Sequence, residues 1–506
     1  MTIKTPSFLH ALISFAAVVL MISTGLFVFD ISLHSIIFVA LVWIGINARL
    51  LGHDYASIQS MMSEAITHAL PAIYIFLLIG MVIASFMQSG TIGTLIYYGL
   101  ALIEPSLFLF TGLLLCCLMS VATGTSWGTV GTLGVVFMGI GAALGVPLAL
   151  VAGMVVSGAT FGDKMSPMSD TTNLAAMSAH ADLYDHIKTM LYTTVPTLVI
   201  VMLLMLWFGF NQSDAVLPDA KIRAIQVALD GSYGLNPLIT LLPLLVMVVL
   251  SVRRVSPQVS MTISIFSAVV IAVIYQGVTI PAVMNALWSN SAGTTGIANI
   301  DNLLGRGGIN SMSWTLLLSI MALALGGMLF KTSILEVLLA GLIGRVKRTA
   351  SLIALTIFSG FVGNVAMGEA YISIILNCQL FADAYKARGL RPSILSRSVE
   401  EGSTVTTALI PWTTAGAFYA VTLGIPVLDY LPYAFFNLLN PFVSVILATL
   451  GWGLLSPSSD KISPAIANND IANSDIANSE IANSAVAKSD QASSENHPEN
   501  KITGKD

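Results

Sequence analysis

The chain has 506 residues, of which 56% are hydrophobic and only 9% charged, with a mean hydropathy of +0.85. Soluble domains carry roughly 25% charged residues, so a chain of this length lacks the charge to cover several water-facing domains. The net charge of −5 also argues against nucleic-acid binding. The composition therefore excludes a soluble, collagen-like or intrinsically disordered protein and predicts a polytopic protein embedded in a lipid bilayer.

Long apolar runs recur along the chain, and they are continuous rather than alternating, which favours α-helices over a β-barrel. The first run follows Lys4 and has no small-residue cleavage site after it, so we interpret it as a span rather than a signal peptide. Together with the interrupted stretches between the runs, they predict an all-α polytopic membrane protein with roughly 10–13 transmembrane helices. The clear runs are 10–29, 32–51, 70–88, 191–210, 237–252, 259–275, 311–330 and 432–453.

Two longer stretches, 105–181 and 350–423, are apolar overall but broken by Gly, Pro, Ser, Thr and a few acids. Segment 157–167 aligns with segment 401–411 at a constant separation of 244 positions, and segment 80–100 aligns with segment 321–342 with one gap. The shared order of such matches indicates an internal repeat, which is typical of secondary transporters with broken helices. We expect a first membrane repeat at 1–210, an extracytoplasmic linker at 211–236 and a second membrane repeat at 237–455.

Basic residues at the ends of the runs indicate the orientation, because cytoplasmic loops are enriched in Lys and Arg. An N-terminus in the cytoplasm places seven of them on the cytoplasmic side. This choice requires an odd number of spans in each half, so the two repeats would be inverted and the C-terminus cytoplasmic. The seven residues are Arg49, Arg253, Arg254, Lys331, Arg345, Lys347 and Arg348.

The last segment, 456–506, has a different composition from the rest of the chain. It repeats a five-residue polar unit of the type Ile-Ala-Asn-Ser-Asp and holds four basic and eight acidic residues. Such units cannot bury a core, so we expect a disordered cytoplasmic tail. The membrane body alone is then nearly neutral.

The densest polar cluster within apolar sequence is segment 157–173, which contains Asp163, Lys164 and Asp170. Charges within a membrane span are costly and normally face a wet cavity with a function. We expect Gly158, Gly162 and Pro167 to open the helix, so that freed carbonyls and side-chain oxygens could hold a small hard cation. The alternative is a surface loop in which Asp163 pairs with Lys164. Supporting oxygens and amides in the cluster are Ser157, Ser169, Thr171, Thr172 and Asn173.

Upstream, segment 122–132 interrupts an apolar run with hydroxyls and glycines, including Thr125 and Ser126. Such a density suits an unwound segment that faces an ion, although close packing of helices through small residues is the alternative. Ser126 also lies in a Gly-x-Ser-x-Gly pattern. That nucleophile motif needs a strand–turn–helix, so a hydrolase is not expected here.

The segment of the second half that corresponds to 122–132 contains Glu369, the only acidic residue between positions 350 and 378. An isolated carboxylate in apolar sequence suits a proton carrier, while a hydrogen bond to a neighbouring helix is the structural alternative. Asn364 and Thr404 lie in the same matched segments. Glu400 and Glu401 stand near Arg397, so a surface ion pair and a binding site both remain open for them.

No P-loop, HExxH zinc motif or Rossmann glycine run is present in the sequence. We therefore expect no cofactor and no enzyme activity, and any transport would be driven by ion gradients.

Taken together, these motifs resemble the NhaC family of Na⁺/H⁺ antiporters over roughly residues 8–453. One departure matters, because family members carry a Gly-Asp-Gln-Tyr run where this chain has Gly-Glu-Ala-Tyr at 368–371. The acid is one methylene longer and the amide is absent, which bears on ion preference and coupling. The resemblance rests on segments 124–131, 157–175, 186–194, 395–404 and 409–416.

The resemblance implies a secondary transporter of a bacterial inner membrane that exchanges Na⁺ or Li⁺ for H⁺ by alternating access. Asp163, Asp170 and Glu369 would bind Na⁺ and H⁺ in competition. The alternative is an ion-coupled carrier of malate, lactate or an amino acid, since the family is also similar to such carriers. In that case, Lys164 and helix N-termini would hold the carboxylate. A homodimer is compatible with either hypothesis.

Overall fold

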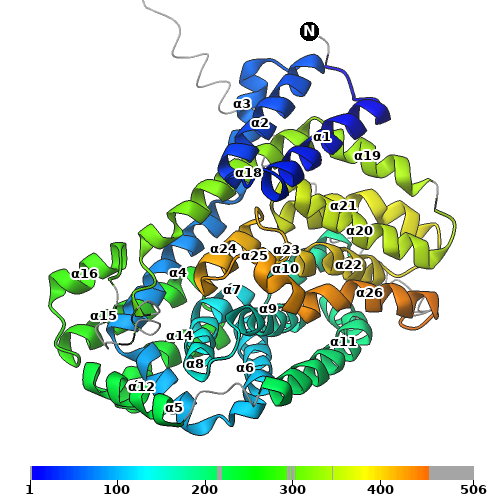
Figure 1. Cartoon of the computed structure of the whole chain (residues 1–506). Helices are drawn as coiled ribbons and strands as arrows, with labels where there is room; N and C mark the ends of the chain where they lie inside the picture. Colours follow the sequence, from blue (N-terminus) through cyan, green and yellow to red (C-terminus); the bar gives the residue numbers. More distant parts are fainter. Residues whose placement is uncertain are drawn as a thin grey trace, which may run out of the picture. The chain divides into compact units, whose positions relative to one another are not determined.

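The computed structural model describes residues 3–212, 219–291, 293, 297, 301, 304–344 and 346–454, and all regular secondary structure in these ranges is helical (Figure 1). The predicted all-α polytopic fold is thereby confirmed. Residues 213–218 of the predicted linker, Arg345 and the predicted disordered tail lie outside the described residues. The remainder of the linker contains a helix, α12 (Asp219–Ser232).

The described residues contain nine helical segments that are long and apolar enough to cross a bilayer, or up to twelve if each bent pair of helices forms one span. This range agrees with the predicted 10–13. The bent pairs are α4 (Leu70–Gln88) with α5 (Thr91–Leu102), α12 with α13 (Pro237–Thr240) and α14 (Leu242–Val252), and α24 (Thr414–Leu423) with α25 (Val427–Tyr430). The nine segments hold α1 (Phe8–Phe27), α2 (Leu33–Leu50), α6 (Phe108–Thr123), α7 (Ser126–Thr129) with α8 (Val135–Leu144), α9 (Leu148–Met165), α11 (Leu183–Gln212), α15 (Pro257–Ile274), α18 (Ser313–Lys331) and α20 (Thr349–Met367).

Most of the predicted runs coincide with these helices, and the run at 70–88 has the same bounds as α4. The last run is shorter in the structure, because α26 spans only Phe435–Thr449. Large apolar side chains such as Leu20, Phe38, Leu203 and Phe266 are exposed on the outer helices, as expected for a lipid-facing surface. The remaining helices are α3 (Tyr55–His68), α10 (Asp170–Ser178), α16 (Ile280–Trp288), α19 (Ile334–Ile343), α21 (Ala370–Lys386), α22 (Pro392–Gly402) and α23 (Thr404–Thr407).

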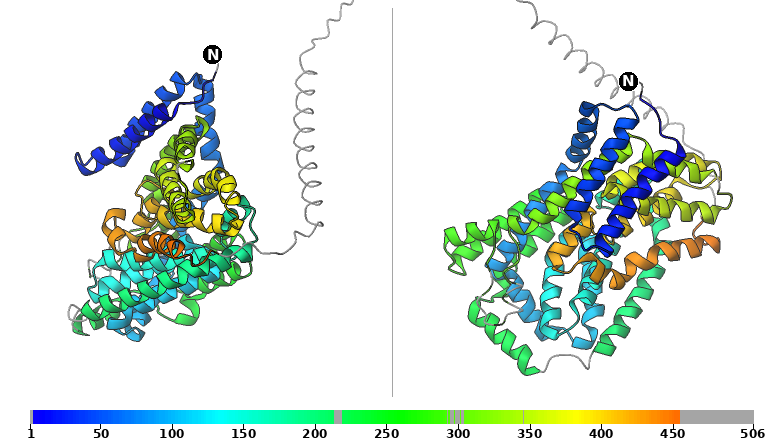
Figure 2. Two further views of the ribbon diagram at one scale, coloured as in Figure 1. Left: turned by 90° about the vertical axis from the view of Figure 1, so that its right-hand side faces the viewer. Right: turned by 45° about the horizontal axis from the view of Figure 1, so that its top comes forward.

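Helices from the two halves of the chain pack against each other in a reciprocal way. The N-terminal hairpin α1–α2 packs against the second half, where α2 contacts α18 and α1 contacts α19 (Figure 2). The corresponding hairpin α14–α15 leans on the first half, where α15 contacts α4. The two halves are therefore interlocked through their first helices.

Helix α9 lies in the middle of the helical body, between α6 and α26, and is mostly buried (Figure 1). The prediction that Gly158 and Gly162 open this helix is wrong, because α9 runs unbroken through both and ends only at Met165. Both glycines instead allow α6 to approach closely. A Cβ on Gly162 would lie 2.4 Å from Ser120 Cβ and 2.5 Å from the Cys117 carbonyl oxygen. The break falls at Ser166 and Pro167, directly before α10.

Candidate ion-binding site

The first break near the site separates α6 from α7. Helix α6 ends at Thr123, Gly124 adopts a left-handed conformation with φ of 69°, and Thr125 is extended with φ of −149° and ψ of 123°. Glycine is required at 124 because a Cβ there would lie 2.7 Å from Met168 Cβ and would need a strained backbone. The Thr125 hydroxyl accepts a hydrogen bond from the Gly128 amide and caps α7. Of the predicted unwound segment 122–132, only Gly124 and Thr125 leave the helical conformation, because α7 begins at Ser126.

Aromatic packing holds the short helix α7 in position. The Trp127 ring stacks on Phe418 at a centroid distance of 5.1 Å and contacts Phe76 at 5.2 Å. Ser126, the first residue of α7, follows a helix and a break rather than a strand. Its surroundings therefore differ from the strand–turn–helix of a hydrolase nucleophile.

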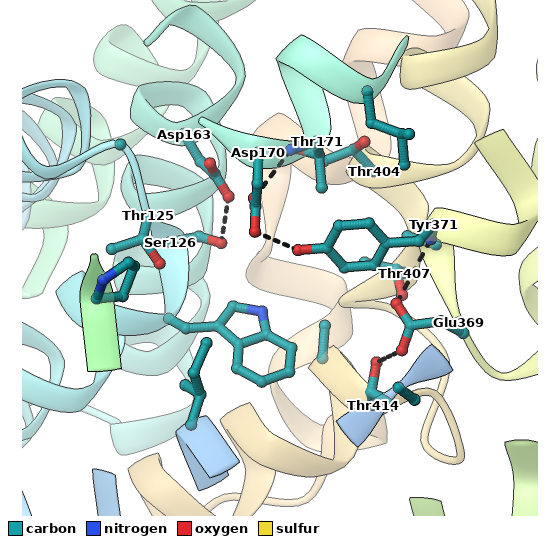
Figure 3. A pocket seen from close by; sticks show the side chains of 18 of the residues that line it. Thr125, Ser126, Asp163, Asp170, Thr171, Glu369, Tyr371, Thr404, Thr407 and Thr414 are labelled. Carbon is teal, nitrogen blue, oxygen red and sulfur yellow. Dashed lines mark hydrogen bonds between the residues drawn. The ribbon is translucent and has the colours of Figure 1, made fainter. Parts of the chain in front are cut away.

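Asp163 lies on the last turn of α9 and points toward this break (Figure 3). Its side chain is only 6% exposed, and Oδ2 accepts a hydrogen bond of 2.6 Å from the Ser126 hydroxyl. Oδ1 is buried and has no hydrogen-bond partner among the described residues. The alternative in which Asp163 pairs with Lys164 is wrong, because the Lys164 ammonium lies 3.8 Å from Glu401. Asp163 is left with an unsatisfied oxygen that a cation or a proton could fill.

The second break has nearly the same backbone geometry as the first. Helix α20 ends at Met367, Gly368 is left-handed with φ of 66°, and Glu369 is extended with φ of −148° and ψ of 128°. Glu369 is 4% exposed, and its Oε2 accepts a hydrogen bond of 2.6 Å from the Thr414 hydroxyl. The predicted alternative of a hydrogen bond to a neighbouring helix is therefore present at this residue.

Asp170 and Tyr371 connect the two broken regions. The Tyr371 hydroxyl, on the first turn of α21, donates a hydrogen bond to Asp170 Oδ2 at the first residue of α10 (Figure 3). Asp170 Oδ1 accepts from the Thr171 amide. Asp170 is accessible rather than buried, which distinguishes it from Asp163 and Glu369.

One cavity of about 740 Å³ collects these side chains. Seven of the thirteen predicted site residues line it: Thr125, Ser126, Asp163, Asp170, Thr171, Glu369 and Thr404. The other six do not line it: Ser157, Lys164, Ser169, Thr172, Asn173 and Asn364. Of these, the Ser169 hydroxyl caps α10 by accepting from the Thr172 amide, and Asn364 donates to the Ser403 carbonyl.

The polar lining residues that were not predicted include Tyr371, Thr407, Thr414 and Tyr419. The repeat contained a signal for two of them. At the separation of 244 positions, Thr407 corresponds to Asp163 and Thr414 corresponds to Asp170. The hydroxyls of Thr404 and Thr407 are buried and have no hydrogen-bond partner among the described residues.

Glu400 and Glu401 do not form a surface ion pair with Arg397, so that alternative is wrong. Both carboxylates are fully buried, and Arg397 donates to the carbonyls of Thr189 and Gly453 instead. Glu400 contacts His186 and Glu401 contacts Lys164. The end of α22 that carries them is thus packed against α10, α11, α20 and α21.

The cavity suits a small hard cation or a proton better than a transition metal. Within the described ranges, no three His, Cys, Asp or Glu side chains converge as a metal-binding group. The polar lining offers carboxylates and hydroxyls, which are hard oxygen ligands, and it also includes the basic residues Arg254 and Lys331. Helix α6 also directs the negative end of its dipole at the break beside Asp163, which favours a positive charge there.

Comparison with known proteins gives one consistent result. Residues 2–171 and 158–452 match the Na⁺/H⁺ antiporter family. The chain is 39% identical to the Na⁺/H⁺ antiporter NhaC of Alkalihalophilus pseudofirmus over 86% of its length and 93% of the relative. It is 36% identical to NhaC of Bacillus subtilis over 83% of its length and 93% of the relative. A malate-2H⁺/Na⁺-lactate antiporter of Bacillus subtilis is 34% identical over 79% of this chain and 84% of the relative.

Proposed function

The chain belongs to the Na⁺/H⁺ antiporter family, and from this we propose that it exchanges Na⁺ or Li⁺ for H⁺ at Asp163 by alternating access. The observation that carries the proposal is the unsatisfied Oδ1 of Asp163, which is buried beside the cavity without a basic partner. An ionised carboxylate in such a place needs a counter-ion, because desolvation without compensation is costly. Either Na⁺ or H⁺ can neutralise it, but not both together.

Neutral oxygens around Asp163 support Na⁺ in preference to an organic substrate. The Ser126 hydroxyl touches the carboxylate, and Thr125 lines the cavity next to it. A hard cation is bound by several such oxygens. The carrier alternative assigned Lys164 to a substrate carboxylate, but this ammonium lies outside the cavity lining and 3.8 Å from Glu401.

The two matched breaks support an inverted repeat as the basis of alternating access. Gly124 with Thr125 and Gly368 with Glu369 have similar backbone angles and lie 244 positions apart. If two such repeats rock about the site, it is exposed to each side of the membrane in turn. In the proposed orientation both termini are cytoplasmic, in a bacterial inner membrane. The membrane potential would then contribute about 2.3 kcal/mol per net charge moved per 100 mV.

Reconstituted protein with an imposed pH gradient tests the proposal. Na⁺ or Li⁺ alone should dissipate the gradient in the native protein, and Asp163→Asn should abolish this while inserting normally. Glu336→Gln is the matched control, because it neutralises an exposed acid on α19 that does not line the cavity. If the gradient falls only when malate, lactate or an amino acid is added, the exchanger proposal fails. Normal exchange in Asp163→Asn would remove Asp163 as the site.

A further inference from the structure

A second group of charged side chains lies behind the ion site and faces away from the cavity. It consists of Lys164 on α9, His186 on α11, and Glu400 and Glu401 on α22, and all four are fully buried. We call these four residues the buried charge cluster. None of them lines the cavity. Buried charges of this density are expensive to maintain in a membrane protein, so a function is expected for them.

The His186–Glu400 contact has two possible hydrogen-bond arrangements, and they differ by one proton. The two side chains meet at 2.8 Å between Nε2 and Oε2. On the other side of the ring, Nδ1 lies 2.7 Å from the Ser396 hydroxyl, which itself donates to the Ser393 carbonyl. That hydroxyl has only one hydrogen, which can go either to the Ser393 carbonyl or to Nδ1. When it goes to Nδ1, neutral His186 donates from Nε2 to the Glu400 carboxylate. When it goes to the carbonyl, Nδ1 donates to the hydroxyl, and the bond between Nε2 and Oε2 takes up one added proton.

The Lys164–Glu401 contact is incompletely satisfied. The ammonium and Oε1 are 3.8 Å apart, too far for a hydrogen bond, and Lys164 Nζ has no hydrogen-bond partner among the described residues. Glu401 Oε1 accepts a bond of 2.5 Å from the Thr193 hydroxyl, whereas Oε2 has no hydrogen-bond partner within the described part of the chain. Charges that are not locked by hydrogen bonds can respond to a change nearby.

One hydroxyl joins the cluster to the ion site. Thr172 Oγ1, on α10, lies 3.1 Å from Glu400 Oε1, 3.2 Å from the Lys164 carbonyl and 3.4 Å from the Asp163 carbonyl. Its single hydrogen can serve only one of these acceptors well. When Glu400 is ionised the hydroxyl donates to it. When Glu400 carries the proton, the hydroxyl can accept from it and donate to the end of α9.

The remaining groups around the pair are few. Helices α20, α23 and α26 carry no ionisable side chain toward α22. The exposed acid Asp170 lies at the start of α10, and Asp185 on α11 accepts from Ser393 at the outer end of α22. Among the described residues, further ionisable groups near Glu400 or its neighbours include Arg397 on α22, and Cys378 and Tyr385 on α21. Arg391, at the start of α22, pairs with Asp185.

We propose that the buried charge cluster is a second proton-binding site, centred on His186 and Glu400, whose occupancy is coupled to Na⁺ binding at Asp163 through Thr172. This inference rests on the proposed exchange at Asp163. The coupling has a direct basis in α9, because Asp163 and Lys164 are consecutive residues on its last turn and face the two sites. A Na⁺ ion that replaces the proton at Asp163 leaves the charge there unchanged, but it needs several oxygen ligands and so shifts the end of α9. Through Thr172, this shift changes how readily the cluster holds its proton.

The test counts protons released per Na⁺ bound as a function of pH. Calorimetric Na⁺ titration of the purified full chain, in two buffers of different ionisation enthalpy, gives this count. We expect the native curve to have two components. Glu400→Gln should lose one component while still binding Na⁺. Thr172→Val should lose the same component with His186 and Glu400 intact, and Thr172→Ser, which keeps the hydroxyl, should retain it.

The outcomes separate this inference from the proposal on which it rests. If both Glu400→Gln and Thr172→Val bind Na⁺ with the native proton-release curve, the cluster has only a packing role and the inference is refuted. It is also refuted if Thr172→Ser loses the component as Thr172→Val does. If the native protein binds Na⁺ without releasing any proton, or if Asp163→Asn binds Na⁺ normally, the exchange proposal itself fails.

Discussion

The hydrogen bond between Ser126 and Asp163 gives a quantitative prediction for ion competition. Ser126→Ala removes the hydroxyl donor to Asp163 Oδ2, a bond of 2.6 Å, from a carboxylate whose Oδ1 has no hydrogen-bond partner among the described residues. The backbone of α7 should be little affected, because its cap is the Thr125 side chain and its position depends on Trp127. The change therefore acts mainly on the carboxylate.

The size of the effect follows from the two states of Asp163. A hydrogen bond to a charged group contributes about 1.5–3 kcal/mol, and one between neutral groups about 0.5–1.5 kcal/mol. Ser126 therefore stabilises the ionised, Na⁺-binding form over the protonated form by about 1–1.5 kcal/mol. Since about 1.4 kcal/mol is a tenfold change, the apparent KM for Na⁺ should rise about five- to tenfold in Ser126→Ala at fixed pH. The maximal rate at saturating Na⁺ should change little.

Initial rates of pH-gradient dissipation in proteoliposomes, measured over a range of Na⁺ concentrations, check this prediction. Ser120→Ala is a suitable control. Its hydroxyl makes a bond of the same length, 2.6 Å, to the Ala159 carbonyl between α6 and α9, but it does not line the cavity. An apparent KM within twofold of the native value in Ser126→Ala, or an equal rise in Ser120→Ala, would refute the reasoning.

Two further predictions concern the second break and the packing of α9. Glu369→Gln should slow exchange strongly but leave Na⁺ binding at Asp163 in place, because an amide cannot carry a proton. Binding of radioactive sodium and dissipation of the pH gradient measure the two properties separately. A native rate of exchange in this variant would contradict a proton-carrying role for Glu369. Gly162→Ala should destabilise the protein by about 1–3 kcal/mol or more through overpacking, since its Cβ would lie 2.4 Å from Ser120 Cβ, whereas Gly45→Ala, with nothing within 4 Å, should not. Thermal unfolding midpoints in detergent compare the two glycine variants, and equal midpoints would contradict the role assigned to the α6–α9 contact.

The sequence by itself determined the fold class and the location of the breaks. Continuous apolar runs in lipid leave helices as the backbone solution, so most spans follow from composition. The break at 124 could be found because glycine and hydroxyl residues interrupt an apolar run, and Glu369 because it is an isolated acid. Whether a segment is helical or interrupted depends here on the residue types within the segment itself, so it can be predicted from the sequence.

The tertiary structure decided which polar groups meet. Consecutive residues on a helix point about 100° apart, so Asp163 and Lys164 face different partners, and only the positions of α7 and α22 show which. Gly158 and Gly162 lie within an unbroken helix because α6 packs onto them, although in the sequence alone they suggest a break. Glu400 and Glu401 are buried because α10, α11, α20 and α21 pack around α22. These outcomes depend on contacts between segments far apart in the chain, which residue order alone does not contain.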